Sequence, residues 1–308
     1  MRNMKRSNHA SLALVTAAVS ALFALTTANA TMIGPVNLGT AGEYTLLALS
    51  GDIVDSGPTG PDAAPYSVNG KIGVVSSSGK FQTSGSRTYS GPIWLHTGAT
   101  FNSSAPGTPP PQYSPAIDAA LAQAASDAFA ASNFALGLSP TATYGTINNN
   151  LTISQGSAGN YVFNIQNIAF SGGKTLTLSA PTGSNFILNI SSGISLTGGN
   201  IVLAGGLTPD HVLINYTGTA DVHFSGGGNS SRMYANLLAP NAHIQISPGF
   251  VAGFIIAGSI QMSSGANVIP TPEVTPSSVI FGFLGLLVAF SSRRALTARV
   301  RAMAHRKS

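Results

Sequence analysis

The residues from Tyr161 to Met262 decide the fold, because short apolar segments follow one another there with only turn residues between them. They read YVFNIQNIAF (161–170), TLTL (175–178), FILNI (186–190), ISL (194–196), NIVL (200–203), HVLINY (211–216), DVHF (221–224), YANLL (234–238), HIQI (243–246), GFII (253–256) and IQM (260–262). Alternation, as in HIQI, places successive side chains on opposite faces of a strand. Many short strands with evenly spaced Gly-, Ser- and Asn-rich turns predict an all-β domain, either a sandwich or a coiled solenoid.

Charged residues are scarce in this 308-residue chain, which holds 14 Lys and Arg and 9 Asp and Glu against 35 Gly. Such a composition disfavours an ordinary helical enzyme and predicts a surface of Ser, Thr, Asn and Gly. The absence of Cys excludes disulfides and thiolate chemistry. The formal net charge is +5, but residues 31–290 carry five basic and nine acidic side chains. No nucleic-acid partner is expected, since phosphates would need clustered Lys and Arg on the folded part.

The N-terminus has the pattern of a secretory signal peptide. Basic residues precede an apolar run from Ala10 to Leu25, and Ala28 and Ala30 stand at the two positions that a signal peptidase reads. A transmembrane anchor is the alternative, but polar residues interrupt the run, which falls short of the roughly 20 apolar residues of a span. We therefore expect export, with cleavage after Ala30.

Short strands are also expected nearer the N-terminus, at 43–49, 52–54, 71–75 and 92–96. Residues 105–115 predict a stiff connector, because consecutive prolines favour polyproline II geometry. A helix is predicted over 115–136, with Ser114 as N-cap, Pro115 at its first position and Gly137 as a left-handed stop. Its alanine-rich apolar stripe indicates that it lies along the β body.

Two segments near the end of the β region, LLAPNA (237–242) and SPGFVAGFIIAGS (247–259), carry a family resemblance. The stretch from about Asn37 to Val268 resembles the choice-of-anchor A family of bacterial surface domains, with a looser similarity to ice-binding-like adhesin domains. The resemblance implies a mainly β fold, a right-handed discontinuous parallel β-solenoid with one long α-helix packed alongside. It thereby selects the solenoid over the sandwich.

The C-terminal tail has three parts in a fixed order. A Pro-rich lead from residue 270 is followed by an apolar run from Val279 to Phe290 and by a basic end that begins at Arg293 and Arg294. An apolar helix of this length reaches about 18 Å, short of a bilayer core of about 30 Å. Basic residues after it stay on the cytoplasmic side of the membrane.

This tail resembles a PEP-CTERM sorting signal, in which a Pro-Glu-Pro motif, a short hydrophobic helix and arginines direct processing by an exosortase. The matching residues are Pro272 and Glu273, whereas Val274 stands where the family has its second proline. A plain tail anchor is the alternative. The expected domains are a signal peptide at 1–30, a β-solenoid at 31–269 and a sorting or anchor tail at 270–308. The resemblance implies an exosortase-type enzyme and the membrane as partners before processing.

No motif in the sequence points to catalysis. The six His lack metal-ligand spacing, and no nucleophile elbow, Walker loop or dinucleotide fingerprint is present. We expect no catalytic residue, no metal and no cofactor. Asp210 and Asp221 flank one predicted strand, and a glycosidase would need them to converge with a basic partner such as Arg232. Thr175 and Thr177 are the one stretch suggestive of a threonine-rich ice-binding face.

Three kinds of function fit these features, and we favour the first. It is a non-catalytic, exported cell-surface or extracellular-matrix protein, targeted by the sorting tail and associated with exopolysaccharide or biofilm. The second is an ice- or glycan-binding adhesin, which would show a flat face of aligned Thr, Ser and Asn or an exposed aromatic row. Glycan stacking is disfavoured by the sparse aromatics, with Trp94 the only tryptophan. The third is a carbohydrate-active enzyme on a β-helix.

Overall fold

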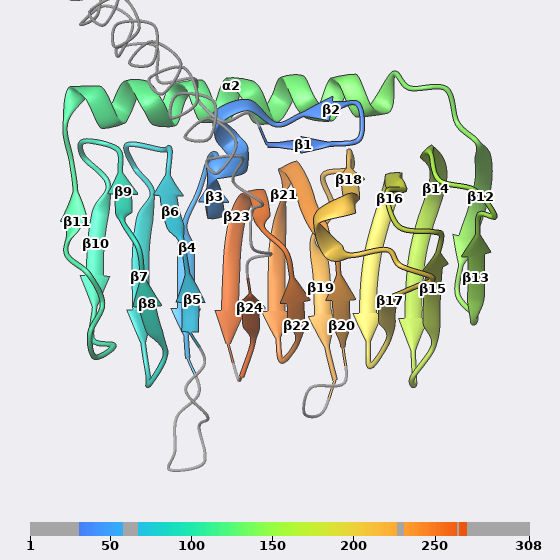
Figure 1. The fold of residues 1–308 in the computed structure, drawn as a ribbon. Helices are drawn as coiled ribbons and strands as arrows, with labels where there is room; N and C mark the ends of the chain where they lie inside the picture. Colours follow the sequence, from blue (N-terminus) through green and yellow to red (C-terminus); the bar gives the residue numbers. More distant parts are fainter. Residues whose placement is uncertain (1–30, 58–66, 227–230, 264, 270–308) are drawn as a thin grey trace, which may run out of the picture. The chain divides into compact units, whose positions relative to one another are not determined.

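The protein is a parallel β-solenoid with one helix along its side (Figure 1). A computed structural model describes residues 31–57, 67–226, 231–263 and 265–269. One sheet of 14 strands covers two sides of the coil, and sheets of six and two strands form the third side. The strand pairings of these sheets are parallel, so the predicted solenoid is confirmed and the sandwich is excluded. The predicted signal helix and tail helix lie outside the described residues.

The first half of the chain winds from the middle of the solenoid toward one end. An antiparallel hairpin of β1 (Met32–Ile33) and β2 (Val36–Asn37) and the 3₁₀-helix η1 (Gly39–Glu43) come first. The strands that follow are β3 (Tyr44–Ala48), β4 (Ile53–Ser56), β5 (Ser67–Asn69), β6 (Lys71–Val74), β7 (Lys80–Ser84), β8 (Thr88–Ser90), β9 (Ile93–Leu95), β10 (Thr100–Ser103) and β11 (Pro111–Gln112).

The helix α2 (Pro115–Leu136) then carries the chain along the side of the coil to its far end, from which the second half winds back (Figure 1). The strands of this half are β12 (Ala142–Ile147), β13 (Leu151–Ser154), β14 (Asn160–Ser171), β15 (Thr175–Ser179), β16 (Asn185–Thr197), β17 (Asn200–Ala204), β18 (Val212–Tyr216), β19 (Val222–Ser225), β20 (Arg232–Tyr234), β21 (Asn236–Ser247), β22 (Phe250–Ala252), β23 (Ile255–Ser263) and β24 (Asn267–Ile269). A second 3₁₀-helix, η2 (Pro209–His211), precedes β18. The last coil meets the first, because β23 pairs with both β3 and β4.

The long strands differ from the sequence prediction. The pattern splits 186–190 from 194–196 and 234–238 from 243–246, but β16 and β21 continue around a corner of the coil. Polar and small residues at those corners interrupt the apolar alternation, and the pairing register shifts there without ending the strand. The short strands β20, β22 and β24 on the third side were not predicted, because two or three residues carry too little alternation.

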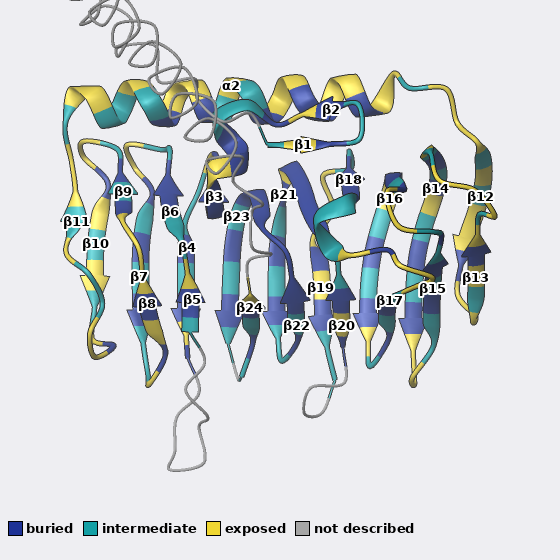
Figure 2. Ribbon diagram, in the orientation of Figure 1, coloured by how far each residue is buried: buried dark blue, intermediate teal, exposed yellow. Residues whose placement is uncertain are grey.

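Inward-pointing side chains stack in columns along the coil axis. Figure 2 shows the resulting alternation of buried and more exposed positions along strands such as β7, whereas β3 and β18 are buried throughout. One column runs through neighbouring coils as Phe81, Ile53, Ile260, Ile244, Val222, Ile194 and Ile168, all of them buried. Apolar residues of similar size at every level bury a continuous core and keep successive coils in the same register.

The predicted helix is confirmed from Pro115 to Leu136 and lies lengthwise on the solenoid. Its N-cap is also confirmed, since the Ser114 hydroxyl accepts a hydrogen bond of 3.1 Å from the Ile117 N–H. The expected left-handed stop is wrong: Gly137 keeps a right-handed conformation with φ −77°, and its N–H bonds back to the last turn. The helix therefore ends where Pro140 and the extended chain beyond it begin.

Alanines line the face of α2 that meets the sheet, which allows a close approach. The buried residues on this face are Leu121, Ala124, Ala128, Ala131, Ser132 and Ala135. They pack on outward side chains of the solenoid that include Leu47, Ile256 and Leu238. Phe129 and Leu136, two large apolar residues of the helix, are exposed.

Toward the end of α2 the sheet presents asparagines instead of apolar side chains. Asn164, Asn189 and Asn215 occupy the same position in three adjacent coils. Asn215 donates to Ser132 O (3.0 Å) and to Asn189 Oδ1 (2.8 Å), and its own Oδ1 accepts from the Ser132 hydroxyl (2.7 Å). Asn189 in turn donates to Ala135 O at 2.8 Å. This asparagine row fixes the last turns of the helix with buried hydrogen bonds.

Asn215→Ala should lower the free energy of unfolding by about 2–3 kcal/mol, because it leaves the buried Ser132 hydroxyl and the Asn189 carbonyl without their partner. Urea unfolding of the full chain measures this. Asn102→Ala, at an exposed position, is the control and should change the stability by less than about 0.5 kcal/mol. Equal effects of the two substitutions would contradict this role of the asparagine row.

A charged pair is enclosed among the N-terminal coils. Asp55 points inward at the level that Met262 fills in the next coil, and its carboxylate accepts hydrogen bonds from Arg87 Nε and from the Tyr89 hydroxyl. The side chains of Asp55 and Arg87 are fully buried. Burial raises the pKa of Asp55, and the opposing effects of Arg87 and Tyr89 do not fully offset it.

Arg87→Met should destabilise the fold by about 3–5 kcal/mol at neutral pH, because it leaves a buried carboxylate without its cation. The pKa of Asp55 then rises further. A carboxyl whose pKa is higher in the folded state than in the unfolded state stabilises the fold fully only below its unfolded-state pKa, which is about 4. This stabilisation is lost as the pH rises through the folded-state pKa. The loss measured by urea unfolding should thus be smaller at pH 4 than at pH 7. A loss independent of pH would contradict this origin.

Candidate functional site

Among the described residues, α2 covers one of the three sides of the solenoid and no element covers the other two. We call one open side the ladder face. It consists of β10, β7, β4 and β19 and of the second halves of β23, β21, β16 and β14, all paired in parallel. We call the other the short-strand face, formed by β5 and β8 and by β13, β15, β17, β20, β22 and β24.

A row of hydroxyls, the serine ladder, runs along the ladder face at the ends of its strands. Direct strand pairing places one such residue beside the next through seven successive coils. The members in order are Ser84, Ser56, Ser263, Ser247, Ser225, Thr197 and Ser171. Two contacts join them along the row: Ser263 Oγ donates to Ser247 Oγ at 2.7 Å, and the Thr197 and Ser225 hydroxyls lie 3.2 Å apart.

A second outward row, two residues earlier in each strand, is rich in amides. Its members in order are Asn102, Gln82, Val54, Gln261, Gln245, His223, Ser195 and Ala169. Gln245 Oε1 lies 3.0 Å from Nδ1 of His223 in the next coil. We call this the amide row; with the serine ladder it repeats polar groups at the spacing of parallel strands, about 4.8 Å.

The buried column beneath the ladder face makes these rows regular. Isoleucines at Ile53, Ile260, Ile244, Ile194 and Ile168 occupy the same inward position in most coils. Stiff β-branched side chains of equal size favour a stack of coils without local steps. Flat sheets are typically stabilised by such side-chain ladders.

The two rows contain no carboxylate and no amine. The only titratable group in them is His223, whose ring nitrogen Nδ1 contacts Oε1 of Gln245. The ion pair of Lys80 and Asp52, at 3.6 Å, lies at the margin of the face, and His243 Nδ1 lies 2.7 Å from Ser259 Oγ along the same margin. Apart from Val54 and Ala169, the serine ladder and the amide row therefore consist of small hydrogen-bonding groups, and neither row contains Lys, Arg, Asp or Glu.

The residues that a glycosidase would need do not come together. Asp210 lies before β18 in η2, and Asp221 lies just after that strand and its turn. The five-residue strand β18 between them is about 16 Å long, whereas catalytic carboxyl pairs lie about 5–10 Å apart. Arg232 begins β20 on the short-strand face. Asp210 instead contacts His211, with Oδ2 3.2 Å from Nδ1. The groove that would have supported the enzyme alternative is not formed by these residues.

The described histidines are likewise dispersed. His96 Nδ1 contacts Thr97 O at 2.7 Å, and His211 contacts Thr208 and Asp210, while His223 and His243 lie on or beside the ladder face. In the described part of the chain, no group of three or more His, Asp and Glu is arranged to hold a metal ion. His9 and His305 lie outside it.

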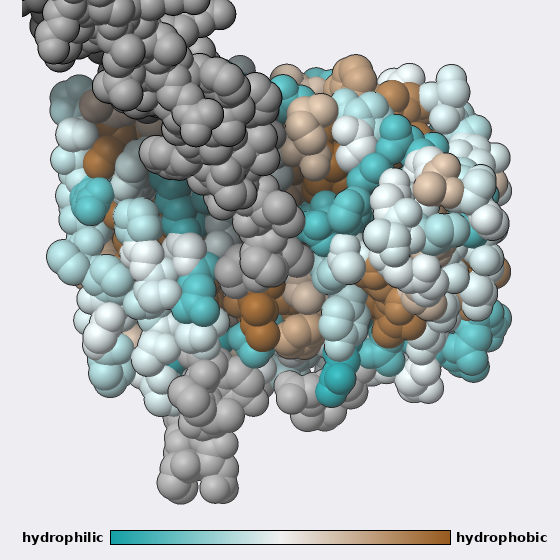
Figure 3. Space-filling view, viewed as in Figure 1, coloured by the Kyte–Doolittle hydropathy of each residue, from teal (hydrophilic) through white to brown (hydrophobic). Residues whose placement is uncertain are grey.

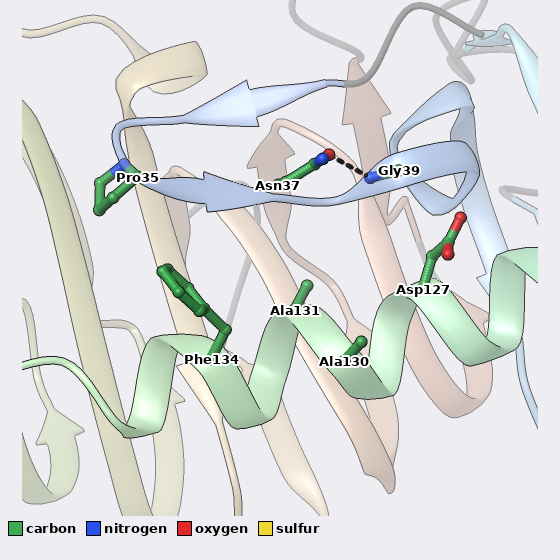
Figure 4. A pocket seen from close by; sticks show the side chains of 7 residues that line it. All are labelled: Pro35, Asn37, Gly39, Asp127, Ala130, Ala131 and Phe134. Carbon is green, nitrogen blue, oxygen red and sulfur yellow. Dashed lines mark hydrogen bonds between the residues drawn. The ribbon is translucent and has the colours of Figure 1, made fainter.

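A shallow hollow of about 340 Å³ lies between β2 and α2 (Figure 4). Its polar groups are already engaged. Asn37 Oδ1 accepts from the Gly39 N–H at 2.8 Å, and Asp127 accepts from the N–H and hydroxyl of Thr40. The remaining lining includes Ala131 and Phe134. The hollow is thus a seam between hairpin and helix, with no reactive group directed into it.

The residues predicted for processing lie outside the described chain. They are Ala28 and Ala30 at the signal cleavage site and Pro272, Glu273, Val274, Arg293 and Arg294 in the sorting tail. Within the described ranges, α2 is not apolar enough to cross a bilayer, and no other helix there is long enough.

The two threonines that suggested an ice-binding face in the sequence are not repeated from coil to coil. Thr175 and Thr177 lie on β15 of the short-strand face, where Thr177 pairs with Thr152 but Thr175 pairs with Asn200. They do not form a ladder. The serine ladder was missed, although each of its members is the last residue before a turn that contains Gly or Pro, as in NIAFSGG, ISLTGG, VHFSGG and IQISPG.

The fold and its faces define a class: discontinuous parallel β-solenoids that present rows of polar side chains and carry one lengthwise helix. A family model described as an ice-binding-like adhesive domain matches residues 24–268. The chain belongs to this family. Curated proteins, by contrast, include no match.

Solved structures support the fold. An ice-binding protein from an Antarctic Flavobacteriaceae bacterium is 20% identical, with a TM-score of 0.52 over 80% of this chain. This chain spans about half of that protein, 48%. The DUF3494 domain of ice-binding protein 1 from Shewanella frigidimarina is 19% identical, with a TM-score of 0.51 over 77% of this chain and 98% of that domain. An ice-binding protein from an Arctic yeast is 18% identical, with a TM-score of 0.50 over 78% and 97%. At these identities the likeness concerns the fold.

Proposed function

We propose that this protein is an exported, non-catalytic adhesin whose ladder face binds ice. The observation that carries the proposal is the alignment of the serine ladder and the amide row on one face, in rows that contain no Lys, Arg, Asp or Glu. Membership in the ice-binding-like adhesive family and the ice-binding proteins of similar fold support it. It replaces the matrix protein that the sequence favoured as the leading function.

The chemistry of the ladder face suits a surface of ordered water. Hydroxyl and amide groups can both donate and accept hydrogen bonds, so each can join a water network in either sense. Repetition at about 4.8 Å offers these groups as a lattice rather than as a pocket. The absence of charges in the rows matters as much, because a charged group holds its own hydration shell and is costly to desolvate.

The proposal also includes the cellular location of the protein. Residues 1–30 would direct export, the domain at 31–269 would bind, and residues 270–308 would act as a PEP-CTERM-type sorting tail read by an exosortase-type enzyme. We place the protein at the cell surface or in the extracellular matrix, in the choice-of-anchor A group of such domains. Association with exopolysaccharide or biofilm belongs to the same proposal, since a displayed adhesin would act within that layer.

Gln261→Lys tests the ladder face, because it places an ammonium in the middle of the amide row. Ice-recrystallisation inhibition and adsorption to a growing ice surface should fall by about tenfold or more, since desolvating a charge costs more than the 1.4 kcal/mol of a tenfold change. The full chain is used, and thermal unfolding should be unchanged.

The matched control is Thr152→Lys, which adds the same charge at an exposed position of the short-strand face. It should retain the activity of the parent chain. Inactivity of the parent protein toward ice, or equal losses from the two substitutions, would overturn the ladder face as the ice-binding site.

Truncation after Ile269 should yield a folded domain that is exported but does not reach its normal location. Ile269 is retained because its carbonyl accepts the Gly253 N–H at 2.9 Å. Within the full chain, Glu273→Ala should block processing, which mass spectrometry of the mature C-terminus would detect as a retained tail. If the mature parent protein keeps its tail, and the Glu273→Ala variant has the same cellular location as the parent, then the tail is an anchor and not a sorting signal.

A further inference from the structure

The short-strand face differs from the ladder face because apolar and aromatic side chains point outward from its middle. Figure 3 shows apolar surface over the region of β24 and β22 and again near β17, among polar surroundings. Tyr234 and Phe250 come from adjacent strands, and their ring centroids lie 5.5 Å apart with the planes tilted by 52°. Ile269, in the same outward row as Tyr234, is 44% exposed.

Strand pairing places polar groups directly beside this aromatic pair. Arg232 stands next to Phe250 in one outward row, and Asn200 stands next to Arg232. The side chain of Arg232 is exposed. No carboxylate points outward from the described strands of this face, whose other outward residues are Ser, Thr, Asn, Ala and Val. The aromatic pair therefore has a guanidinium at its side, on a face whose described strands present no outward carboxylate.

The patch by itself is too small to form a stable protein interface. It spans four coils, about 14 Å at the spacing of parallel strands, and two side chains in width, about 7 Å. The resulting 100 Å², roughly, is far below the approximately 800 Å² that each partner buries in a typical protein complex. A narrow strip with rings, an amide and a guanidinium matches a linear chain of sugars better, because sugars offer apolar C–H faces and hydroxyls in alternation.

From this juxtaposition we infer that the short-strand face binds an acidic polysaccharide, one built with uronic acids, at Tyr234, Phe250, Arg232 and Asn200. The rings contact the apolar face of a sugar. Arg232 donates to the uronate carboxylate, for which a planar guanidinium is well suited. Asn200 exchanges hydrogen bonds with hydroxyls of the next sugar. The site is separate from the ladder face, so a single molecule would hold ice and matrix on different sides.

Polygalacturonate is the probe, with neutral dextran and inorganic polyphosphate for comparison, and the full chain is titrated by calorimetry or affinity electrophoresis. Polygalacturonate should bind. Dextran, which has no carboxylate, and polyphosphate, which has no apolar sugar face, should bind about tenfold more weakly or not at all. Arg232→Gln and Tyr234→Ser should each weaken polygalacturonate binding by about tenfold or more. Ice activity should be unchanged in both variants, which also demonstrates that they fold.

Gln82→Ala on the ladder face is the control and should bind polygalacturonate as the parent does. The inference is overturned if the parent chain does not bind polygalacturonate, or if polyphosphate binds equally well, since charge alone would then suffice. It is also overturned if both variants bind as the parent does, or if size-exclusion chromatography shows a dimer that Phe250→Ala dissociates. If variants of the ladder face lose ice binding but still bind polygalacturonate, that result concerns only the proposed ice-binding function and not the polysaccharide site.

Discussion

The rest of the structure depends on the pairing of β23 with β3 and β4. This pairing joins the last coil of the chain to the first, with Ile255 beside Leu46 and Ile260 beside Ile53. Without it the protein would be two short stacks, each with open sheet edges at the join. With it, one core runs through both halves, and the serine ladder passes from Ser263 to Ser56 without a gap.

The length and position of α2 follow from the pairing of β23 with β3 and β4. Because the first half winds outward from the middle, the chain must return along the whole coil before the second half begins. The side that α2 covers has ten strands from β11 to β12, which extend about 43 Å at the spacing of parallel strands. The 22-residue helix spans about 33 Å, and the extended segments at its two ends supply the remainder. The alanines of α2 allow the helix to lie close to the sheet, and the asparagine row fixes its last turns.

Sequence periodicity identified many of the strands and the helix, but it did not show which strands lie next to one another. Alternation in HIQI or TLTL identifies a strand, and Ser114 with Pro115 identifies a helix start, because these signals are local. Which coil stacks on which is a long-range property, so the solenoid itself came from the family resemblance. The asparagine row had a usable signal, since FNI, LNI and INY place Asn164, Asn189 and Asn215 at intervals of 25 and 26 residues. The serine ladder was similarly visible in its repeated pre-turn position, whereas the pairing of Tyr234 with Phe250 required the register.

The proposed function rests on one continuous ladder face across the pairing of β23 with β3 and β4, and disulfide trapping tests this continuity most directly. The chain has no Cys, so Ser56→Cys with Ser263→Cys introduces the only thiols. Paired residues of adjacent parallel strands have Cα atoms about 4.8 Å apart, within the range for a disulfide. Mild oxidation should close an intramolecular disulfide in the folded protein, whereas Ser56→Cys with Ser171→Cys, at distant coils, should stay reduced. Closure of the distant pair, or failure of the adjacent pair in a folded protein, would contradict the continuous face.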